Sequence, residues 1–238
     1  MVNPSRQQRL LALRRRYRLS EDAVAKLAAF LNSLVTDPFA PTAVRDANRA
    51  LDDHLADSLV ALELEEVRRA RTIADLGSGA GVPGLPLAIA LPAEVALVES
   101  NTRKCAFINR ALATSDIVNA TVICERAESF TDGLARFDLV TARALAPLPV
   151  VAEYAAPLLS VGGALLVWRG RRNPEEEADG AEAASQLGLE AHSPILVSPY
   201  EGAQNRHLQL MLKVRSTPPG FPRRPGLARK RPLGRTGS

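Results

Sequence analysis

A short apolar segment that runs into a glycine-rich turn and then into a second apolar segment constrains the fold of this chain most. Residues 72–76 are largely apolar, which is typical of a strand buried on both faces of a parallel sheet. Four glycines follow within eight residues: Gly77, Gly79, Gly81 and Gly84. Because glycine has no Cβ, this density indicates a backbone that approaches a bound molecule closely. Residues 85–91 predict a helix, and its N-terminus favours an anionic or strongly polar ligand group.

Two ligand chemistries fit this turn. From Gly79, the residues GAGVPG match the dinucleotide pattern G-x-G-x-x-G, and Glu99 lies twenty positions further on, where a ribose-binding acid is expected. From Asp75, the residues DLGSGAG give an acid followed by G-x-G-x-G, the turn of S-adenosylmethionine-dependent methyltransferases. We favour the second interpretation, because it places the first glycine directly at the strand end. It also gives Asp75 a place at the carboxyl edge of the sheet, where α/β folds bind ligands.

Predicted strands and helices alternate along the rest of the chain. Further strands are predicted at 94–98, 120–124, 137–141 and 163–168, and a hairpin-like pair at 195–198 and 207–214. Helices are predicted at 103–114 and 154–159, and the acidic run 175–179 indicates a solvated helix face. This alternation predicts an α/β fold with a doubly wound sheet.

Helical patterns also precede the first strand. Residues 5–35 predict two helices, with Ser20 as the cap of the second, and residues 47–69 predict a further amphipathic helix. We therefore expect one globular unit in three parts: an N-terminal helical cap (1–70), an α/β core (71–215) and a basic, proline-rich tail (216–238) without regular structure.

Polar candidates follow the predicted strands at the carboxyl edge of the sheet. Glu99 ends the second strand, where its carboxylate can accept hydrogen bonds from both hydroxyls of a ribose. Ala127 and Glu128 follow the third strand and are expected to hold an adenine. Arg143 follows the fourth strand and is expected either to act on the substrate or to be an ion-pair partner.

Charge is distributed unevenly along the chain. The net charge is +4, yet residues 213–238 contain no acid and eight basic residues, so the remainder has a net charge of −4. Residues 1–20 add six arginines, also without an acid. Basic ends on a slightly acidic body favour a polyanionic partner such as RNA. The expected phosphate contacts in the tail are Arg223, Arg224, Arg229, Lys230 and Arg231.

Cysteine spacing and hydropathy bear on disulfides, metal sites and the cellular compartment. Cys105 and Cys124 form neither a CxxC pair nor a metal-ligand cluster, so we expect buried thiols, no structural disulfide and no metal site. No segment approaches the roughly 18 apolar residues of a membrane helix, and no signal sequence is evident. We expect a cytoplasmic monomer that does not contact a membrane.

Eight segments together resemble the RsmG (GidB) family, the ribosomal RNA small subunit methyltransferases G. They are TAVRD (42–46), HLADSL (54–59), DLGSGAGVPGLPLAI (75–89), TRKCAF (102–107), RAE (126–128), FDLVTARALAPL (137–148), RHLQLMLK (206–213) and FPRRPGLARKRPL (221–233). The resemblance implies a class I (Rossmann-like) S-adenosylmethionine-dependent methyltransferase fold with an N-terminal helical extension. It also implies methyl transfer from S-adenosylmethionine to N7 of one guanine in 16S ribosomal RNA of the small subunit.

By matched position, the resemblance implies cofactor contacts from Gly77, Val82, Ala127, Glu128 and Arg143. The spacing of the turn predicts three further cofactor contacts: Gly79, Gly81 and Glu99. Arg143 is also the one catalytic candidate. The chain departs from the family pattern where NLT is replaced by APT (40–42), RH by DH (53–54) and LKG by WRG (168–170). We expect these positions to handle substrate RNA rather than cofactor.

Guanine N7 carries a lone pair and no proton, so its methylation requires no general base. The expected mechanism is alignment of N7 with the methyl group. Two alternatives are a nicotinamide-dependent oxidoreductase that uses GAGVPG and a non-catalytic RNA-binding or assembly protein that retains the fold.

Overall fold

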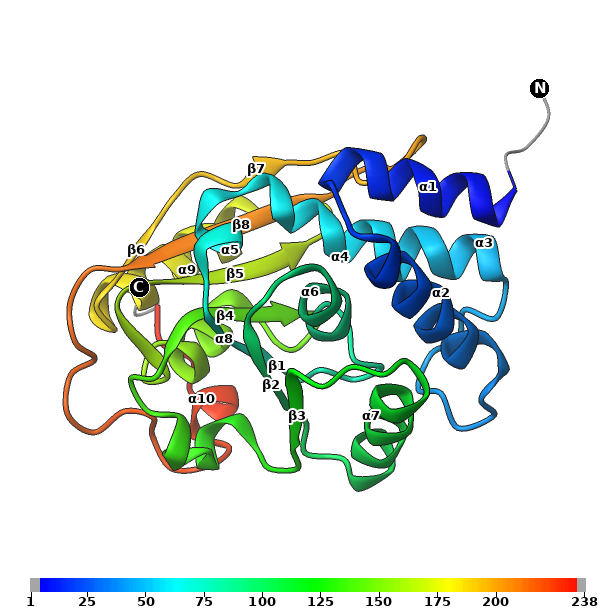
Figure 1. Cartoon of the computed structure of the whole chain (residues 1–238). Coiled ribbons are helices and arrows are strands. Elements are labelled where there is room, and N and C mark those ends of the chain that lie inside the picture. Colours follow the sequence, from blue (N-terminus) through cyan, green and yellow to red (C-terminus); the bar gives the residue numbers. More distant parts are fainter. Residues whose placement is uncertain (1–4, 235–238) are drawn as a thin grey trace.

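A computed structural model describes residues 5–234, which form one mixed β-sheet with helices on both faces (Figure 1). The strands are β1 (Thr72–Leu76), β2 (Glu94–Val98), β3 (Ala120–Ile123), β4 (Phe137–Arg143), β5 (Leu159–Arg169), β6 (Leu189–Ala191), β7 (Ile195–Leu196) and β8 (His207–Lys213). The sheet order is β3-β2-β1-β4-β5-β8-β6, and β7 pairs with β8 outside this order. Strands β1 to β5 are parallel, whereas β8 is antiparallel to both β5 and β6. The predicted α/β architecture is confirmed.

The helices are α1 (Arg6–Tyr17), α2 (Glu21–Thr36), α3 (Ala47–Ala50), α4 (Asp57–Leu59), α5 (Glu65–Arg69), α6 (Gly84–Ala90), α7 (Thr102–Thr114), α8 (Leu148–Ala155), α9 (Pro174–Gln186) and α10 (Leu227–Lys230). As predicted, Ser20 caps α2, with its hydroxyl accepting a hydrogen bond from the Ala23 amide at 3.0 Å. No helix within residues 5–234 is long and apolar enough to cross a bilayer.

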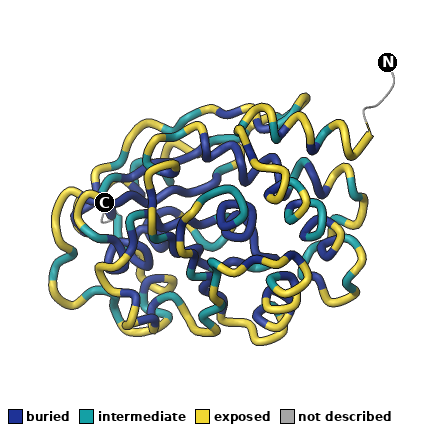
Figure 2. The backbone as a smooth tube through the Cα atoms, viewed as in Figure 1, coloured by how far each residue is buried: buried dark blue, intermediate teal, exposed yellow. Residues whose placement is uncertain are grey.

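Two apolar clusters cover the two faces of the sheet. One joins α1, α2, α6 and α7 to inward side chains such as Ile73 and Leu97. The other joins α8 and α9 to the opposite side chains, among them Val140 and Leu165. The buried segments therefore run through the centre of the molecule, with exposed backbone around them (Figure 2). Because both faces of the sheet are covered, β1 and β4 are buried along nearly their whole length.

Three helical predictions need correction. The stretch 47–69 is not one helix: a π-helical turn (Leu51–Ala56) separates α3 from α4, and a 3₁₀ turn (Val60–Glu63) separates α4 from α5. The helix predicted at 154–159 is α8, which starts six residues earlier because Pro149 fits its first turn. The tail is not devoid of regular structure, since α10 forms there and Ala228 is buried against the cluster around α8.

Candidate cofactor and substrate site

The glycine turn connects β1 to α6 and is anchored by a buried carboxylate. Asp75 accepts hydrogen bonds from the Gly84 amide at 3.1 Å and from the Thr141 hydroxyl at 2.8 Å. Its side chain is fully buried, and burial raises the pKa of Asp75 to about 6. Asp75 therefore lies at the carboxyl end of β1, as expected, and fixes the turn to β4.

Glycine is required in this turn for conformation and for space. Gly77 and Gly79 adopt φ angles of +68° and +57°, a region that other residues rarely occupy. A Cβ on Gly77 would lie only 2.6 Å from Leu145 Cδ1, in the segment that follows β4. The turn and that segment are thus in direct contact.

A cavity of about 440 Å³ lies beside the turn, at the carboxyl ends of β1, β2 and β4. Four of the predicted cofactor residues line it: Gly77, Glu99, Ala127 and Glu128. Gly79 is not part of the lining, but its amide donates a hydrogen bond to Glu99, which is. The lining does not include Gly81 and Val82, which lie within the turn, and Arg143 lines a neighbouring cavity.

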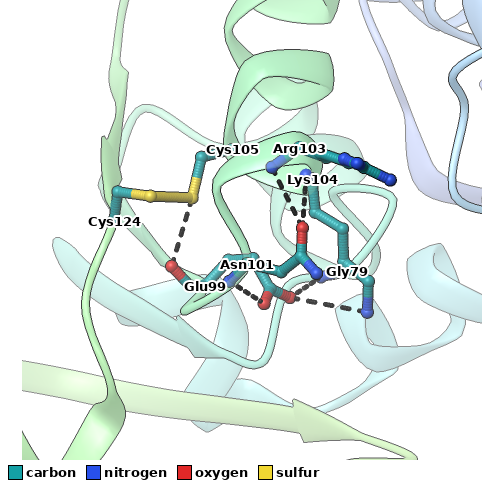
Figure 3. Close-up of a disulfide and its surroundings, with 7 residues drawn as sticks. All are labelled: Gly79, Glu99, Asn101, Arg103, Lys104, Cys105 and Cys124. Carbon is teal, nitrogen blue, oxygen red and sulfur yellow. Dashed lines mark hydrogen bonds and ion pairs between the residues drawn. A yellow bond between two sulfur atoms is a disulfide. The ribbon is translucent and has the colours of Figure 1, made fainter.

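Glu99 is held in a fixed orientation at the end of β2 (Figure 3). One carboxylate oxygen accepts a hydrogen bond from the Gly79 amide at 3.0 Å, and the other accepts one from the Asn101 amide at 2.8 Å. Lys104 Nζ lies 4.0 Å from the first oxygen. A carboxylate has about four lone-pair sites, so each oxygen can still accept a hydroxyl donor such as that of a ribose.

The two cysteines form a disulfide at the same corner of the sheet (Figure 3). Cys105 lies in the first turn of α7 and Cys124 directly follows β3, and their Cα atoms are 6.0 Å apart. The prediction of two buried thiols is therefore wrong, and Cys124 is exposed. Sequence spacing gives no sign of this pairing, because the crossover from α7 to β3 brings the two residues together. Within residues 5–234, no group of three or more His, Cys, Asp or Glu side chains is arranged to hold a metal ion.

The adenine side of the cavity contains a free acceptor and an unsatisfied hydroxyl. Among residues 5–234, the hydrogen bonds to Glu128 all go to Oε1, from the Arg126 guanidinium and the Gly226 amide, which leaves Oε2 available. Burial opposes ionisation of Glu128, but hydrogen bonds from its own backbone amide, from Arg126 and from Gly226 outweigh it and lower its pKa. Tyr154 is buried, and its hydroxyl has no partner in the described part of the chain. An adenosine group, which carries donors and acceptors, fits this lining.

A second cavity, of about 450 Å³, lies on the other side of the segment that follows β4. Arg143, Asp57, Trp168 and Arg206 contribute to its lining. Ala144 borders both cavities and has a φ of +53°, a strained conformation for a residue with a Cβ. The two cavities therefore meet at one residue.

Arg143 faces the N-terminal helices. Its guanidinium donates to Asp57 Oδ2 at 3.0 Å and to the Asp53 carbonyl at 2.8 Å, and Nη2 lies 3.3 Å from His54 Nδ1. Since arginine only donates, His54 Nδ1 accepts, and His54 Nε2 donates to the Thr42 hydroxyl at 2.9 Å. Burial, together with the charge of Arg143, lowers the pKa of His54 to about 4. His54 is therefore neutral at pH 7, with both nitrogens engaged.

Sequence reasoning gave no role to Asp57 and Arg206 of the second cavity, whereas Asp53 and Trp168 were expected to handle substrate RNA. Arg206 donates to Asp53 at 3.1 Å and to the Tyr200 hydroxyl at 3.0 Å, and Trp168 Nε1 donates to the Asp57 carbonyl at 2.7 Å. These residues lie far apart in sequence, so only the matched motifs that contain them, such as HLADSL, could have marked them.

This sheet order and cavity define a class I S-adenosylmethionine-dependent methyltransferase. Solved structures with the same fold include a variant of MtNAS in complex with S-adenosylmethionine, with a TM-score of 0.56 and 18% identity over 87% of this chain and 78% of that one. Another is an S-adenosylmethionine-dependent O-methyltransferase from Thermotoga maritima, with a TM-score of 0.55 and 15% identity over 79% of this chain and 72% of that one.

The chain belongs to the ribosomal RNA small subunit methyltransferase G family, whose model (GidB) matches residues 23–207. A relative of that name from Chloroflexus aggregans is 38% identical over 90% of this chain and 92% of its own length. One from Thermotoga neapolitana is 34% identical over 91% of this chain and 94% of its own length.

Proposed function

We propose that this protein, a cytoplasmic monomer, transfers a methyl group from S-adenosylmethionine to N7 of a guanine in 16S ribosomal RNA of the small subunit. One observation carries the proposal: the cofactor cavity and the second cavity meet at Ala144. Because Ala144 lines both cavities, we expect the methyl donor on one side of this residue and the accepting base on the other. Relatives named ribosomal RNA small subunit methyltransferase G support the RNA as substrate.

Residues of the first cavity are assigned to binding and orientation. S-adenosylmethionine supplies an electrophilic methyl group on a sulfonium centre. With the cofactor bound, Glu99 would accept the ribose hydroxyls, and Glu128 Oε2, the Ala127 amide and the Tyr154 hydroxyl would hold the adenine. Each polar group is already positioned by hydrogen bonds or by packing, so little order has to be gained on binding.

Two possible bases of the second cavity are already engaged, and a third, His207, lies 3.0 Å from the Gly170 carbonyl through Nδ1. His54 has both ring nitrogens engaged, and Asp57 is paired with Arg143 at 3.0 Å. Guanine N7 has no proton to lose: it forms the new N–C bond while the S–C bond breaks and sulfur retains the electron pair. Alignment is therefore the contribution that this geometry favours. Arg143 acts here as a positioning residue, fixed between β4 and the N-terminal helices.

Neither alternative function is favoured. A nicotinamide-dependent oxidoreductase needs an acid–base group for hydride chemistry, and His54 is not free for that role. A non-catalytic RNA-binding protein would not need a cofactor cavity that meets a second cavity.

Methyl transfer to small subunits that lack the modification tests the proposal. We expect transfer of radiolabelled methyl from S-adenosylmethionine, followed by borohydride and aniline cleavage at one guanine, the signature of N7 methylation. Glu99→Ala should weaken cofactor binding roughly thirtyfold to hundredfold, because two hydrogen bonds are lost. Glu94→Ala, an exposed acid at the other end of β2, is the matched control. Transfer without cleavage at a guanine would contradict the N7 assignment, and no transfer would contradict the activity.

A further inference from the structure

The C-terminal segment returns to the cofactor cavity. After β8, the chain runs along the face of the sheet that α8 and α9 cover, where α10 lies next to α8 (Figure 1). Ala228 is buried in the apolar cluster on this face, and Phe221 and Leu233 pack against it. The segment 221–233 is therefore docked on the protein itself.

A buried ion pair anchors this segment. Glu153 on α8 has a relative exposure of 1%, and Arg223 Nε donates to it at 2.8 Å. Arg223 Nη2 pairs with the second carboxylate oxygen and also donates to the Arg231 carbonyl at 2.8 Å. Arg223 thus ties the segment before α10 to α8 and to the residue after α10. Because its guanidinium is engaged in these contacts, its assignment as a phosphate contact is corrected.

Beyond this anchor, the segment contacts the cofactor cavity at two points. The Gly226 amide donates to Glu128 Oε1 at 3.1 Å, so it helps to orient the carboxylate on the adenine side. Arg229 lines the cavity and donates to the Leu145 carbonyl at 3.1 Å. Leu145 in turn packs against Gly77 of the glycine turn. The tail therefore contacts both walls of the cavity.

The remaining cations of the segment face solvent. Arg224, Lys230 and Arg231 are exposed, and no ion pair involves them in the described part of the chain. Lys230 and Arg231 directly follow Arg229, so a phosphate that orders them also restrains the side chain that lines the cavity.

We propose that residues 221–231 form a latch that completes the cofactor site, with Arg229 as a cofactor-binding residue, and that RNA phosphates on Arg224, Lys230 and Arg231 close it. This inference rests on the proposed function for the identity of the cofactor and the RNA. Because binding couplings are reciprocal, RNA should raise cofactor affinity, and cofactor should raise RNA affinity by the same factor.

Titration calorimetry of the full-length protein with S-adenosylhomocysteine tests the first part. Arg229→Ala should weaken binding roughly tenfold, the value of one lost charged hydrogen bond, without a change in thermal stability beyond that of the control. Arg229→Lys should restore part of the affinity, because the amine can still donate. Arg69→Ala, an exposed arginine on α5 that lines neither cavity, is the matched control and should bind like the unmodified protein. Equal affinity of Arg229→Ala and Arg69→Ala would overturn the role of Arg229.

The coupling is tested with unmethylated small subunits as the RNA probe. A variant with Arg224, Lys230 and Arg231 changed to Ala should keep its affinity for S-adenosylhomocysteine in the absence of RNA. It should lose the increase in that affinity that small subunits produce in the unmodified protein. Its subunit binding should show a salt slope, log affinity against log salt, that is shallower by about two, given roughly 0.7 per contact. An unchanged gain and slope would overturn the coupling. If the unmodified protein binds S-adenosylhomocysteine but does not methylate small subunits, the proposed function is wrong. The calorimetry of Arg229→Ala still decides the role of Arg229 in that case.

Discussion

Replacing Arg223 by alanine should destabilise the protein through the charge that it leaves behind. Glu153 has a relative exposure of 1%, and the Arg223 side chain supplies its charge partner, with the Arg223 backbone amide adding a hydrogen bond at 3.3 Å. Removing one member of a buried pair costs about 3–5 kcal/mol, because the other charge is left unpaired. At roughly 2–4 °C per kcal/mol for a chain of this size, the melting temperature should fall by roughly 6–20 °C.

Two controls isolate the mechanism. Arg224→Ala removes the neighbouring exposed charge and should change the free energy of unfolding by less than about 0.5 kcal/mol. The double variant Arg223→Met with Glu153→Leu removes both charges and should recover most of the loss, since apolar pairs can replace buried ion pairs at little cost.

Denaturant unfolding and limited tryptic digestion should be combined, because the tail can detach before the domain unfolds. If the tail detaches, water reaches Glu153, and the measured loss in the free energy of unfolding is limited to the free energy with which the tail docks. The detached tail is also accessible to trypsin. If Arg223→Ala matched Arg224→Ala in both unfolding and digestion, the anchor would carry no stability and the argument would be refuted.

Three further expectations concern the body of the protein. Gly77→Ala places a Cβ 2.6 Å from Leu145 Cδ1 at a φ of +68°, so cofactor affinity in calorimetry should fall at least about tenfold while the protein stays folded. As the pH falls from 6 to 4, the depressed pKa of His54 lowers the free energy of unfolding by up to about 3 kcal/mol, and the raised pKa of Asp75 increases it by a similar amount. The unmodified protein should therefore change little in stability over this range. Asp75→Asn, which lacks the compensating group, should lose stability below pH 6 in denaturant melts. Reduction of the disulfide, which spans 19 residues, should lower stability by about 3 kcal/mol, and Cys105→Ser should melt the same with or without reductant.

Local sequence signals predicted the parts of the fold that depend on local chemistry. The strands at 72–76 and 94–98 were predicted with the observed bounds, because each is an apolar run ended by a glycine or an acid. Elements set by tertiary packing were less predictable. Nothing in residues 47–69 marks a π-helical turn, and β6 is only three residues long. Helix α8 begins at Leu148, six residues before its predicted start, where it packs in the apolar cluster on the sheet.

The site shows the same division. Glu99 could be predicted because it directly follows β2, and Glu128 because it lies in the loop after β3, and parallel strands end at one edge. The contacts of Arg143 and the docking of Arg223 could not, because their partners lie 86 and 70 positions away in sequence. The composition shows that the tail is basic, but it does not show that Arg223 of the tail pairs with Glu153 on α8.

Both terminal extensions act on the same three residues. The N-terminal helices hold Arg143 through Asp57, and the C-terminal tail holds the Leu145 carbonyl through Arg229. Between them lies Ala144, which borders both cavities and is kept at a positive φ. A reaction that depends on alignment rather than on acid–base groups is sensitive to displacements of about 1 Å. The two extensions therefore fix, from opposite sides, the segment that borders both the proposed cofactor cavity and the proposed substrate cavity.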